Sequence, residues 1–196
     1  MEKALVFATN NLNKLQEVRE MLTGLFSVRS LADIGCTEEL PETGDTFEFN
    51  SMQKASYVAE KYGVDVFAED TGLCVDALNG QPGVYSARYA GLQREAADNM
   101  NLLLSKLKDK DNRQAAFRTI FSLIRGNEKL QFEGLCKGTI ATQHMGNQGF
   151  GYDPIFIPEG EERSFAQMSR AEKAAISHRG RGLQKLLVHL RNSGEI

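Results

Sequence analysis

Residues 64–73, Val-Asp-Val-Phe-Ala-Glu-Asp-Thr-Gly-Leu, constrain the fold of this chain more than any other segment. The apolar run that ends at Ala68 predicts a buried strand, and Glu69 and Asp70 follow it directly. Two carboxylates at the end of a buried strand lose hydration, so they need a cation, a basic side chain or backbone N–H groups as partners. The segment therefore predicts a divalent-metal site or, in the simpler interpretation, a solvated acidic turn after the strand.

Composition narrows the class of protein. A chain of 196 residues with 41% hydrophobic residues can bury one core, so we expect one domain, with or without two lobes. A net charge of -3 gives no basic surface for the phosphates of duplex nucleic acid. No apolar run approaches the ~18 residues of a membrane span, and the N-terminal residues 1–8 lack the layout of a signal peptide. We therefore expect a cytoplasmic protein that binds neither nucleic acid nor membranes.

Cysteine and histidine usage limits the metals that the chain can bind. Cys36, Cys74 and Cys136 are odd in number, widely spaced and without a Cys-x-x-Cys pair, which argues against a disulfide framework and a thiolate zinc site. The three histidines have no ligand spacing. A hard cation bound by carboxylate oxygens, either magnesium or manganese, is the metal that the sequence supports.

The N-terminal region predicts a strand over Lys3–Ala8, a polar loop over residues 9–14 (Thr-Asn-Asn-Leu-Asn-Lys) and then an amphipathic helix. Unpaired N–H groups and the positive dipole end at the start of a helix attract phosphate, and Lys14 adds a charge there. The segment is not a Walker loop, because no Gly-x-x-x-x-Gly-Lys occurs. An ordinary capped helix start is the alternative interpretation.

Hydrophobic periodicity predicts a mixed sheet. We expect further strands at residues 26–31, 115–125 and 129–141, two strands within 64–78 interrupted at 70–72, and helices at 46–62, 94–107 and 177–191. Gly126-Asn127 separates two alternating runs and predicts an antiparallel hairpin. Asn50 and Lys54 are one turn apart on the second helix, so they share a face, although a lysine there is most often solvated.

Two further segments suggest ligand contacts. Phe150 lies between two glycines in 146–156, where the backbone can approach closely and the ring can stack on a flat ligand; a plain turn is the alternative. Ser177 is the expected N-cap of the last helix, which places His178 and Arg179 in its first turn. Because basic residues oppose the helix dipole there, we expect them to face an anion or an acceptor-rich ligand.

Taken together, these segments resemble the inosine triphosphatase family, the non-canonical purine nucleoside triphosphate pyrophosphatases. The matching segments are Ala8-Thr9-Asn10 with Lys14, Pro41-Glu42-Thr43-Gly44, Asn50 with Lys54-Ala55, 68–73, Pro82-Gly83 with 85–89, 149–156, and Glu172-Lys173 with Ser177-His178-Arg179. They follow one another along nearly the whole chain. This chain departs from the family at Phe49-Asn50-Ser51, where many members read Glu-Asn-Ala, and at Glu69, where aspartate is frequent.

The resemblance implies a fold and an activity. The implied fold is an elongated mixed β-sheet flanked by helices, a single domain over 1–196 whose two lobes enclose a central active-site cleft, and the implied assembly is a homodimer. The implied reaction hydrolyses dITP, ITP and XTP to the monophosphate and pyrophosphate with Mg²⁺ or Mn²⁺, which removes deaminated purines from the nucleotide pool.

The resemblance also implies roles for individual residues. Glu42 and Asp70 would be the metal ligands, and Asp70 would also accept the proton of the attacking water. The implied triphosphate contacts are Thr9, Asn10, Asn11, Leu12, Asn13, Lys14, Lys54, Thr71 and Lys173. Phe150 would stack on the base. The edge of the base would be lined by Gly151, Tyr152, Asp153, His178 and Arg179.

The chemistry of these residues is consistent with that reaction. Glu42 and Asp70 suit one metal ion better than Glu69 and Asp70, because adjacent residues on a strand point to opposite faces. Arg179 only donates hydrogen bonds, so it would donate to the O6 of a 6-oxo purine and leave the N6 donor of adenine unpaired. Two rivals remain: a pyrophosphatase acting on pyrimidine or methylated nucleotides, and a nucleotide- or nucleic-acid-binding module without turnover.

Overall fold

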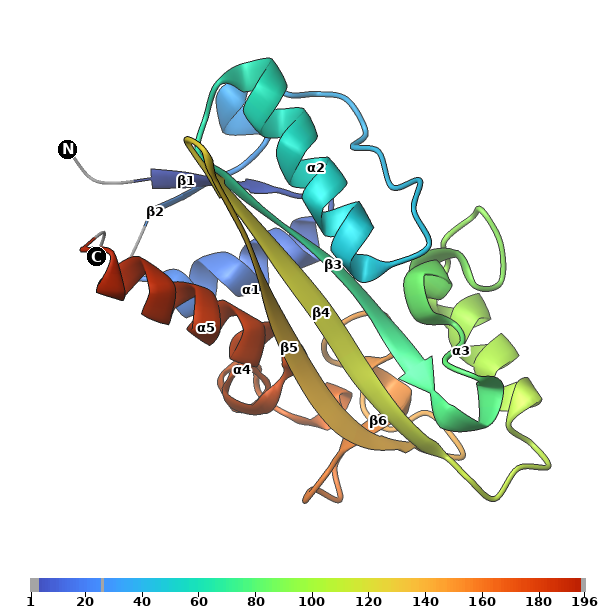
Figure 1. Cartoon of the computed structure of the whole chain (residues 1–196). Coiled ribbons are helices and arrows are strands. Elements are labelled where there is room, and N and C mark those ends of the chain that lie inside the picture. The colour runs from blue at the N-terminus through green and yellow to red at the C-terminus, as the bar shows by residue number, and fades with distance from the viewer. Residues whose placement is uncertain (1–3, 26, 195–196) are drawn as a thin grey trace. The chain divides into compact units, whose positions relative to one another are not determined.

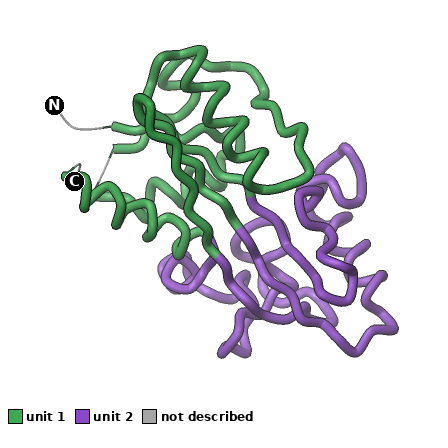
Figure 2. The backbone as a smooth tube through the Cα atoms, viewed as in Figure 1, with its two compact units in different colours: residues 1–70, 119–134, 179–196 green, residues 71–118, 135–178 purple. Residues whose placement is uncertain are grey.

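The structure, a computed structural model, describes residues 4–25 and 27–194. The chain divides into two compact units, each built from segments far apart in the sequence (Figure 2). Unit 1 contains residues 1–70, 119–134 and 179–196, and unit 2 contains residues 71–118 and 135–178. The predicted single two-lobed domain with a central cleft stays a prediction, and each unit is described by itself.

The strands form one sheet in the order β2-β1-β3-β4-β5-β6 (Figure 1). Their bounds are Ala4–Ala8 for β1, Ser27–Arg29 for β2, Val66–Val75 for β3, Gln114–Arg125 for β4, Glu128–Ile140 for β5 and Phe156–Pro158 for β6. β1 pairs in parallel with both β2 and β3, and β6 is antiparallel to β5. The turn Gly126-Asn127 joins β4 to β5. The predicted mixed sheet is therefore confirmed.

The predicted interruption at residues 70–72 is wrong. β3 is one strand from Val66 to Val75 and continues through Asp70-Thr71-Gly72. Threonine and glycine next to an aspartate are typical of a turn, but the local signal gives way here because both sides of the strand are buried. Asp70 therefore lies inside a strand rather than in a solvated turn.

Five α-helices accompany the sheet in the described part of the chain. They are α1 Leu12–Leu22, α2 Phe47–Tyr62, α3 Ala96–Lys106, α4 Arg170–Ile176 and α5 His178–Asn192. Short 3-10 helices lie at Ala32–Ile34, Asp76–Leu78, Gly83–Arg88, Asp153–Ile155 and Phe165–Gln167. The helix starts have local causes: Asn11 accepts a bond from the backbone of Lys14, and Thr46 accepts one from Phe49. Ser177 directly precedes α5, as expected of its N-cap position.

Unit 1 has hydrophobic contacts on both faces of its strands. On one face Phe67 of β3 stacks on Phe7 with ring centroids 4.7 Å apart, and this cluster includes α1 and α5. On the other face Val66 and Ala68 pack with α2. Because side chains of a strand alternate, Glu69 follows the face of Phe67 and Asp70 follows the face of Ala68.

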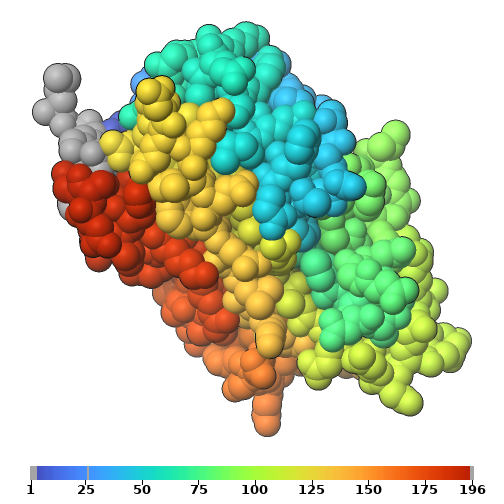
Figure 3. Space-filling model, in the orientation of Figure 1, coloured from blue at the N-terminus to red at the C-terminus, as the bar shows by residue number. Residues whose placement is uncertain are grey.

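The β4–β5 hairpin also contributes to unit 1. The first half of β5 lies against α2, and Figure 3 shows the two segments in contact at the surface. Gln131 of β5 donates to the carbonyl of Glu48 in α2 at 2.8 Å and to the hydroxyl of Ser122 in β4 at 3.0 Å. Ser122 in turn is 2.7 Å from the hydroxyl of Ser51, so neutral hydrogen bonds fix α2 on the strands.

Unit 2 has its own hydrophobic cluster around Phe117 of β4. The Phe117 ring lies 4.7 Å from Phe156, edge to face, and stacks on His178 at 4.6 Å. Leu73 of β3 and Leu103 of α3 are fully buried in the same cluster. This core supports the glycine-rich segment 146–156. Within the described residues, no helix has the length and apolar character needed to cross a membrane.

Candidate active site

The loop before α1 is shaped by its own asparagines. Thr9 accepts a hydrogen bond from the backbone of Asn11 at 3.1 Å, and Asn11 accepts one from the backbone of Lys14 at 3.1 Å. The Asn10 amide donates to the carbonyl of Glu38 and accepts from the backbone of Leu40, both at 3.1 Å. These side chains hold the loop and the segment that leads to residue 42, while their contacts with a ligand stay predictions.

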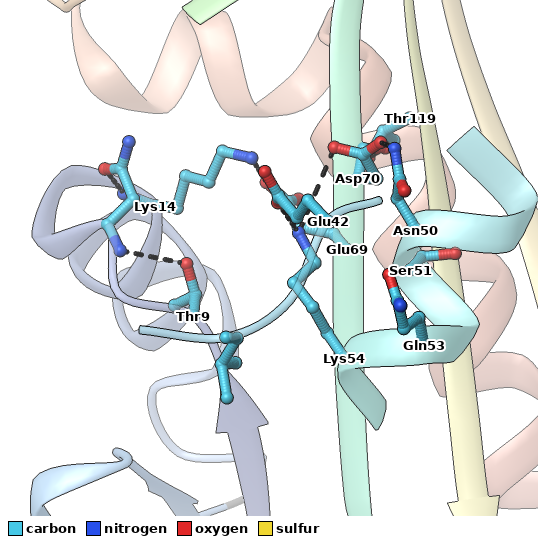
Figure 4. Close-up of polar contacts among 12 residues, drawn as sticks. Thr9, Lys14, Glu42, Asn50, Ser51, Gln53, Lys54, Glu69, Asp70 and Thr119 are labelled. Carbon is cyan, nitrogen blue, oxygen red and sulfur yellow. Dashed lines mark hydrogen bonds and ion pairs between the residues drawn. The ribbon is translucent and has the colours of Figure 1, made fainter. Parts of the chain in front are cut away.

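The side chain of Leu12 is exposed, at 78% of its surface, and Asn13 lies beside it in the first turn of α1. Neither makes a contact that explains a role in binding, so both remain predicted contacts. Lys14, one residue further, points its ammonium toward buried carboxylates (Figure 4). The segment therefore contributes one positive charge, the Lys14 ammonium, which points toward Glu69.

Asn50 of α2 joins Asp70 to the loop around residue 44. Its amide donates to Asp70 Oδ2 at 3.2 Å and to the carbonyl of Gly44 at 3.2 Å, and it accepts from the backbone of Gly44 at 2.8 Å. A Cβ at position 44 would lie 2.2 Å from the ring of Phe49, so a larger residue there would force the exposed Phe49 side chain to shift. The predicted shared face of Asn50 and Lys54 is confirmed, because both reach Asp70.

Lys54 connects the two predicted metal ligands. Its ammonium forms a short ion pair with Glu42 and lies 3.9 Å from Asp70 Oδ1 (Figure 4). Two carboxylates that reach the same cation are close enough to take part in one site. No group of three His, Cys, Asp or Glu side chains suited to a metal occurs among the described residues. Mg²⁺ is commonly held by one or two carboxylates together with phosphate oxygens, so this donor set fits a hard cation that arrives with a nucleotide.

Burial raises the pKa of Asp70 above its usual value of 3.8. The charges of Lys54 and Lys14 oppose this shift, the charge of Glu42 adds to it, and the bond from Asn50 opposes it. Burial dominates because only 6% of the residue is exposed. A carboxylate with a raised pKa is a better proton acceptor, which is the property expected of a general base.

Glu69 lies on the opposite face of β3 and is bound by two cations. Arg179 donates to Glu69 Oε2 from Nε at 2.9 Å and to Oε1 from Nη2 at 2.7 Å, and the ammonium of Lys14 is 3.0 Å from Oε1. Burial alone would raise the pKa of Glu69, but the charges and hydrogen bonds of Arg179 and Lys14 outweigh it and leave the pKa well below the usual range. Glu69 is therefore an ionised carboxylate whose oxygens are occupied.

Arg179 was expected at the edge of a bound base, and the structure gives it other partners. It is 1% exposed, and besides Glu69 it donates from Nη1 to Glu17 of α1. Base contact by Arg179 stays a prediction. Sequence reasoning missed Glu17, although its spacing gave a signal: it is three residues after Lys14 and shares a face of α1 with it.

The second group of predicted residues lies in unit 2. Asp153 Oδ2 accepts a bond from the backbone of Phe150 at 2.8 Å and from the ammonium of Lys173 at 2.6 Å. The same ammonium is 4.8 Å from the centroid of the Phe150 ring. Gly149 has a φ of 74°, and a Cβ there would lie 2.1 Å from Asp153 Oδ2, so only glycine allows this arrangement. Lys173 thus accompanies the predicted stacking ring, whereas Lys14 and Lys54 belong to unit 1.

The remaining predicted residues of unit 2 are partly structural. Tyr152 is buried and its hydroxyl donates to the carbonyl of Ser86 at 2.8 Å. His178 is buried against Phe117. Gly151 adopts a φ of 63°, and Thr71 is half-buried in β3 directly after Asp70. Their contacts with a base or a phosphate stay predictions.

Comparison with known proteins places the chain in a family. The Ham1 family profile matches residues 5–189. A dITP/XTP pyrophosphatase of Flavobacterium psychrophilum is 54% identical over 96% of this chain and 99% of its own length, and one of Bacillus subtilis is 45% identical over 94% and 95%. The solved structure of the Staphylococcus aureus Ham1 protein has a TM-score of 0.88 and 36% identity, covering 97% of this chain and all of its own. The chain described here belongs to the Ham1 family.

Proposed function

We propose that this protein hydrolyses dITP, ITP and XTP to the nucleoside monophosphate and pyrophosphate. The observation that carries the proposal is the ammonium of Lys54 shared by Glu42 and Asp70, which gathers a cation-binding pair and a candidate base. Curated relatives named dITP/XTP pyrophosphatase, 54% and 45% identical, support the choice of substrates.

Unit 1 supplies the charges for a triphosphate. A nucleoside triphosphate carries about four negative charges, of which a divalent cation neutralises about two. Lys14 and Lys54 can meet the rest, which explains how a chain with a net charge of -3 accommodates this anion. Both ammonium groups are held by carboxylates and are mostly shielded from water, with side-chain exposures of 15% and 6%.

Glu42 and Asp70 are the residues that would hold Mg²⁺ or Mn²⁺. A bound ion of this kind neutralises the charge that develops on the phosphate oxygens during attack at the α-phosphorus. Asp70 accepts the proton of the attacking water, a role suited to its raised pKa. Asn50 orients Asp70 by donating to Oδ2 at 3.2 Å.

Unit 2 supplies groups for the base. Phe150 offers a ring for stacking, and the ammonium of Lys173, held by Asp153, is the donor that lies over that ring. An ammonium has donors only, so it donates to the O6 of hypoxanthine or xanthine and has no acceptor for the N6 donor of adenine. We therefore assign the reading of O6 to Lys173 rather than to Arg179. A homodimer, which the family resemblance implies, is also part of the proposal.

The test is a panel of nucleotides with purified protein and Mg²⁺. ITP, dITP and XTP are expected to give the monophosphate and pyrophosphate, with far slower turnover of GTP, ATP and TTP. Omission of the metal with a chelator should abolish the product, and Mn²⁺ should restore it in part. Fast turnover of TTP would favour the pyrimidine alternative, and absence of any product would favour a binding module. Asp70→Asn serves as the control for contaminating phosphatases.

A further inference from the structure

Residues 42–44 run beside α2, and each of the three contacts a different side chain of that helix (Figure 4). The three pairs are Glu42 with Lys54, Thr43 with Gln53, and Gly44 with Asn50. Positions i, i+3 and i+4 of a helix lie on one face, so a single face of α2 holds the whole segment. The carboxylate of Glu42, a proposed metal ligand, is thus carried by a segment that is fastened to α2 residue by residue.

The ion pair between Glu42 and Lys54 is the least suited of these contacts to hold the segment when ligands bind. Glu42 is proposed to hold a divalent ion and Lys54 to contact the triphosphate, and positive charges at close range repel one another. The two ligands would therefore weaken this ion pair. The hydrogen bonds from Gln53 and Asn50 are neutral, so neither the metal nor the phosphates compete for them electrostatically.

Gln53 uses both ends of its side-chain amide on Thr43. The amide oxygen accepts from the backbone N–H of Thr43 at 3.0 Å, and the amide nitrogen donates to the Thr43 hydroxyl at 2.8 Å. Two directional bonds to one residue restrict its rotation as well as its position. Asn50 also donates to Asp70, so a change at Asn50 would disturb the proposed base as well. Gln53 is therefore the side chain through which the Glu42 segment can be loosened without a direct change at Asp70.

A second anchor holds the start of the same loop. Glu38 accepts from the hydroxyl of Tyr62 at 2.9 Å and pairs with the ammonium of Lys61, both at the C-terminal end of α2. The Asn10 amide donates to the carbonyl of Glu38 at 3.1 Å. These contacts do not involve Gln53, so a substitution there loosens residues 42–44 while the loop stays attached at residue 38.

We propose that Gln53 is a positioning residue that holds Glu42 in place for a divalent cation. It acts through Thr43, the chain neighbour of Glu42, and its effect falls on the metal rather than on the phosphates. The motif Asn50-x-x-x-Lys54 leaves position 53 unspecified, so the resemblance assigns no role to this residue. The inference rests on the proposed function for the identity of the metal ligands.

Inorganic tripolyphosphate is the probe, offered as its sodium salt and as its Mn²⁺ complex. Calorimetry gives a dissociation constant for each form, and the ratio of the two constants measures how much the metal tightens binding. Gln53→Met keeps the length of the side chain and its helix propensity but removes both bonds to Thr43. We expect it to reduce the ratio about fivefold, as for the loss of one or two neutral hydrogen bonds, and to leave metal-free binding within about twofold.

Gln131→Met is the matched control. It is the same substitution, and it also removes two glutamine bonds that hold α2, those to the carbonyl of Glu48 and the hydroxyl of Ser122. It should lower the midpoint of urea unfolding and leave the ratio unchanged. An equal fall of the ratio in both variants would show that any loosening of α2 has this effect, and would overturn the proposal.

A double-mutant cycle tests the route through Thr43. Thr43→Val removes the hydroxyl and keeps the shape of the side chain, so it should reduce the ratio by a smaller factor, about twofold. Added to Gln53→Met, it should cause no further loss, because the bond that it removes is already absent. Losses that multiply in full would refute the route through Thr43.

Calorimetry requires no turnover, so failure of this inference can be told from failure of the proposed function. An unchanged ratio in Gln53→Met, or a wild type in which Mn²⁺ does not tighten binding, would overturn the positioning role. A lowered ratio in a protein that does not hydrolyse ITP would reject the proposed function and retain the role. If ITP is hydrolysed, Gln53→Met should need about fivefold more Mg²⁺ for half-maximal turnover, with kcat at saturating Mg²⁺ within about twofold of the wild type.

Discussion

Glu69 and Asp70 are consecutive on β3 and nearly equally buried, at 1% and 6% exposure, yet they occupy different electrostatic environments. On the side of α1 and α5, Glu69 is bound by Arg179 and Lys14. On the side of α2, Asp70 has a neutral amide from Asn50 at 3.2 Å and a more distant ammonium from Lys54 at 3.9 Å. Burial is common to both, so the partners decide how each carboxylate behaves.

The pKa values of the two groups move in opposite directions for this reason. Burial raises the pKa of Asp70, whereas the charges of Arg179 and Lys14 overcome burial and lower the pKa of Glu69. A fully paired carboxylate stabilises a structure and is a poor proton acceptor. A carboxylate whose burial outweighs the effect of its partners lowers stability and is a better proton acceptor. One face of β3 thus carries a carboxylate that stabilises the fold, Glu69, and the other face carries one suited to accept a proton, Asp70.

The largest effect is expected for Glu69→Gln. The change leaves the buried Arg179 with Glu17 as its remaining carboxylate among the contacts described above, and breaking a buried ion pair in this way reduces the free energy of unfolding by about 3 to 5 kcal/mol. Urea unfolding followed by circular dichroism measures it. Glu17→Gln is the matched control and should lose less, since Glu69 still neutralises Arg179. Equal losses in the two variants would contradict the central position of Glu69.

Asp70→Asn should produce the reverse pattern. Because Asp70 is the proposed base and a proposed metal ligand, its loss should lower kcat for ITP by ~10² or more, equivalent to about 2.7 kcal/mol in the barrier. The free energy of unfolding should stay the same or increase, because the substitution removes a buried charge whose pKa is raised by that burial. Steady-state kinetics and urea unfolding of the same preparation provide both readings. A large loss of unfolding free energy in Asp70→Asn would contradict the view that Glu69 stabilises the fold and Asp70 does not.

The pH dependence of stability in metal-free protein separates the faces more finely. The folded state holds a proton on Asp70 at pH values where the unfolded chain, with a pKa near 3.8, has released it. The wild type therefore gains stability relative to Asp70→Asn as the pH falls through the raised pKa, and the gain levels off below about 3.8. Unfolding free energies measured at intervals from pH 7 to 4 should show the gap between these two proteins closing.

Glu69 should behave oppositely in the same series. Its lowered pKa means that its contribution is complete above the usual value of 4.5 and is lost as the pH falls below it. The deficit of Glu69→Gln should hence stay constant from pH 7 to about 5 and shrink only under more acidic conditions. A deficit that already shrinks near pH 6 would show that Arg179 and Lys14 do not dominate the environment of Glu69.

Much of the contrast between Glu69 and Asp70 could be predicted from the sequence, but the ion pair between Glu69 and Arg179 could not. Alternation along a strand predicted that Glu69 and Asp70 face opposite sides, and helical spacing predicted that Asn50 and Lys54 share one face of a helix. The continuity of β3 was missed because Thr71-Gly72 is locally indistinguishable from a turn. Whether a buried strand continues depends on the neighbours that cover it.

The pairing of Glu69 with Arg179 depends on tertiary structure and could not be predicted from local sequence. Arg179 is 110 residues away, and its contact depends on where α5 packs. The resemblance assigns Arg179 to the edge of the base, which stays a prediction, while the structure shows it bound to Glu69 and Glu17. Lys173 was grouped with the other lysines, but its contacts with Asp153 and Phe150 depend on the path of residues 149–153. Sequence motifs therefore identify which side chains belong to the site, but their contacts depend on how the helices and loops pack.

The smallest effect is expected on the α2 side, where neutral hydrogen bonds hold the helix. Ser51 and Ser122 are fully buried with hydroxyl oxygens 2.7 Å apart, and Gln131 donates to Ser122 at 3.0 Å. Ser51→Ala removes the contact with Ser122 and the bond to the carbonyl of Glu48, and it leaves Ser122 with Gln131, so the free energy of unfolding should fall by about 1 to 2 kcal/mol. The loss should be independent of salt and of pH between 5 and 8, because none of these three groups is charged. A loss as large as that of Glu69→Gln would mean that both faces depend equally on buried polar contacts, and the contrast between a charged support and a neutral one would fail.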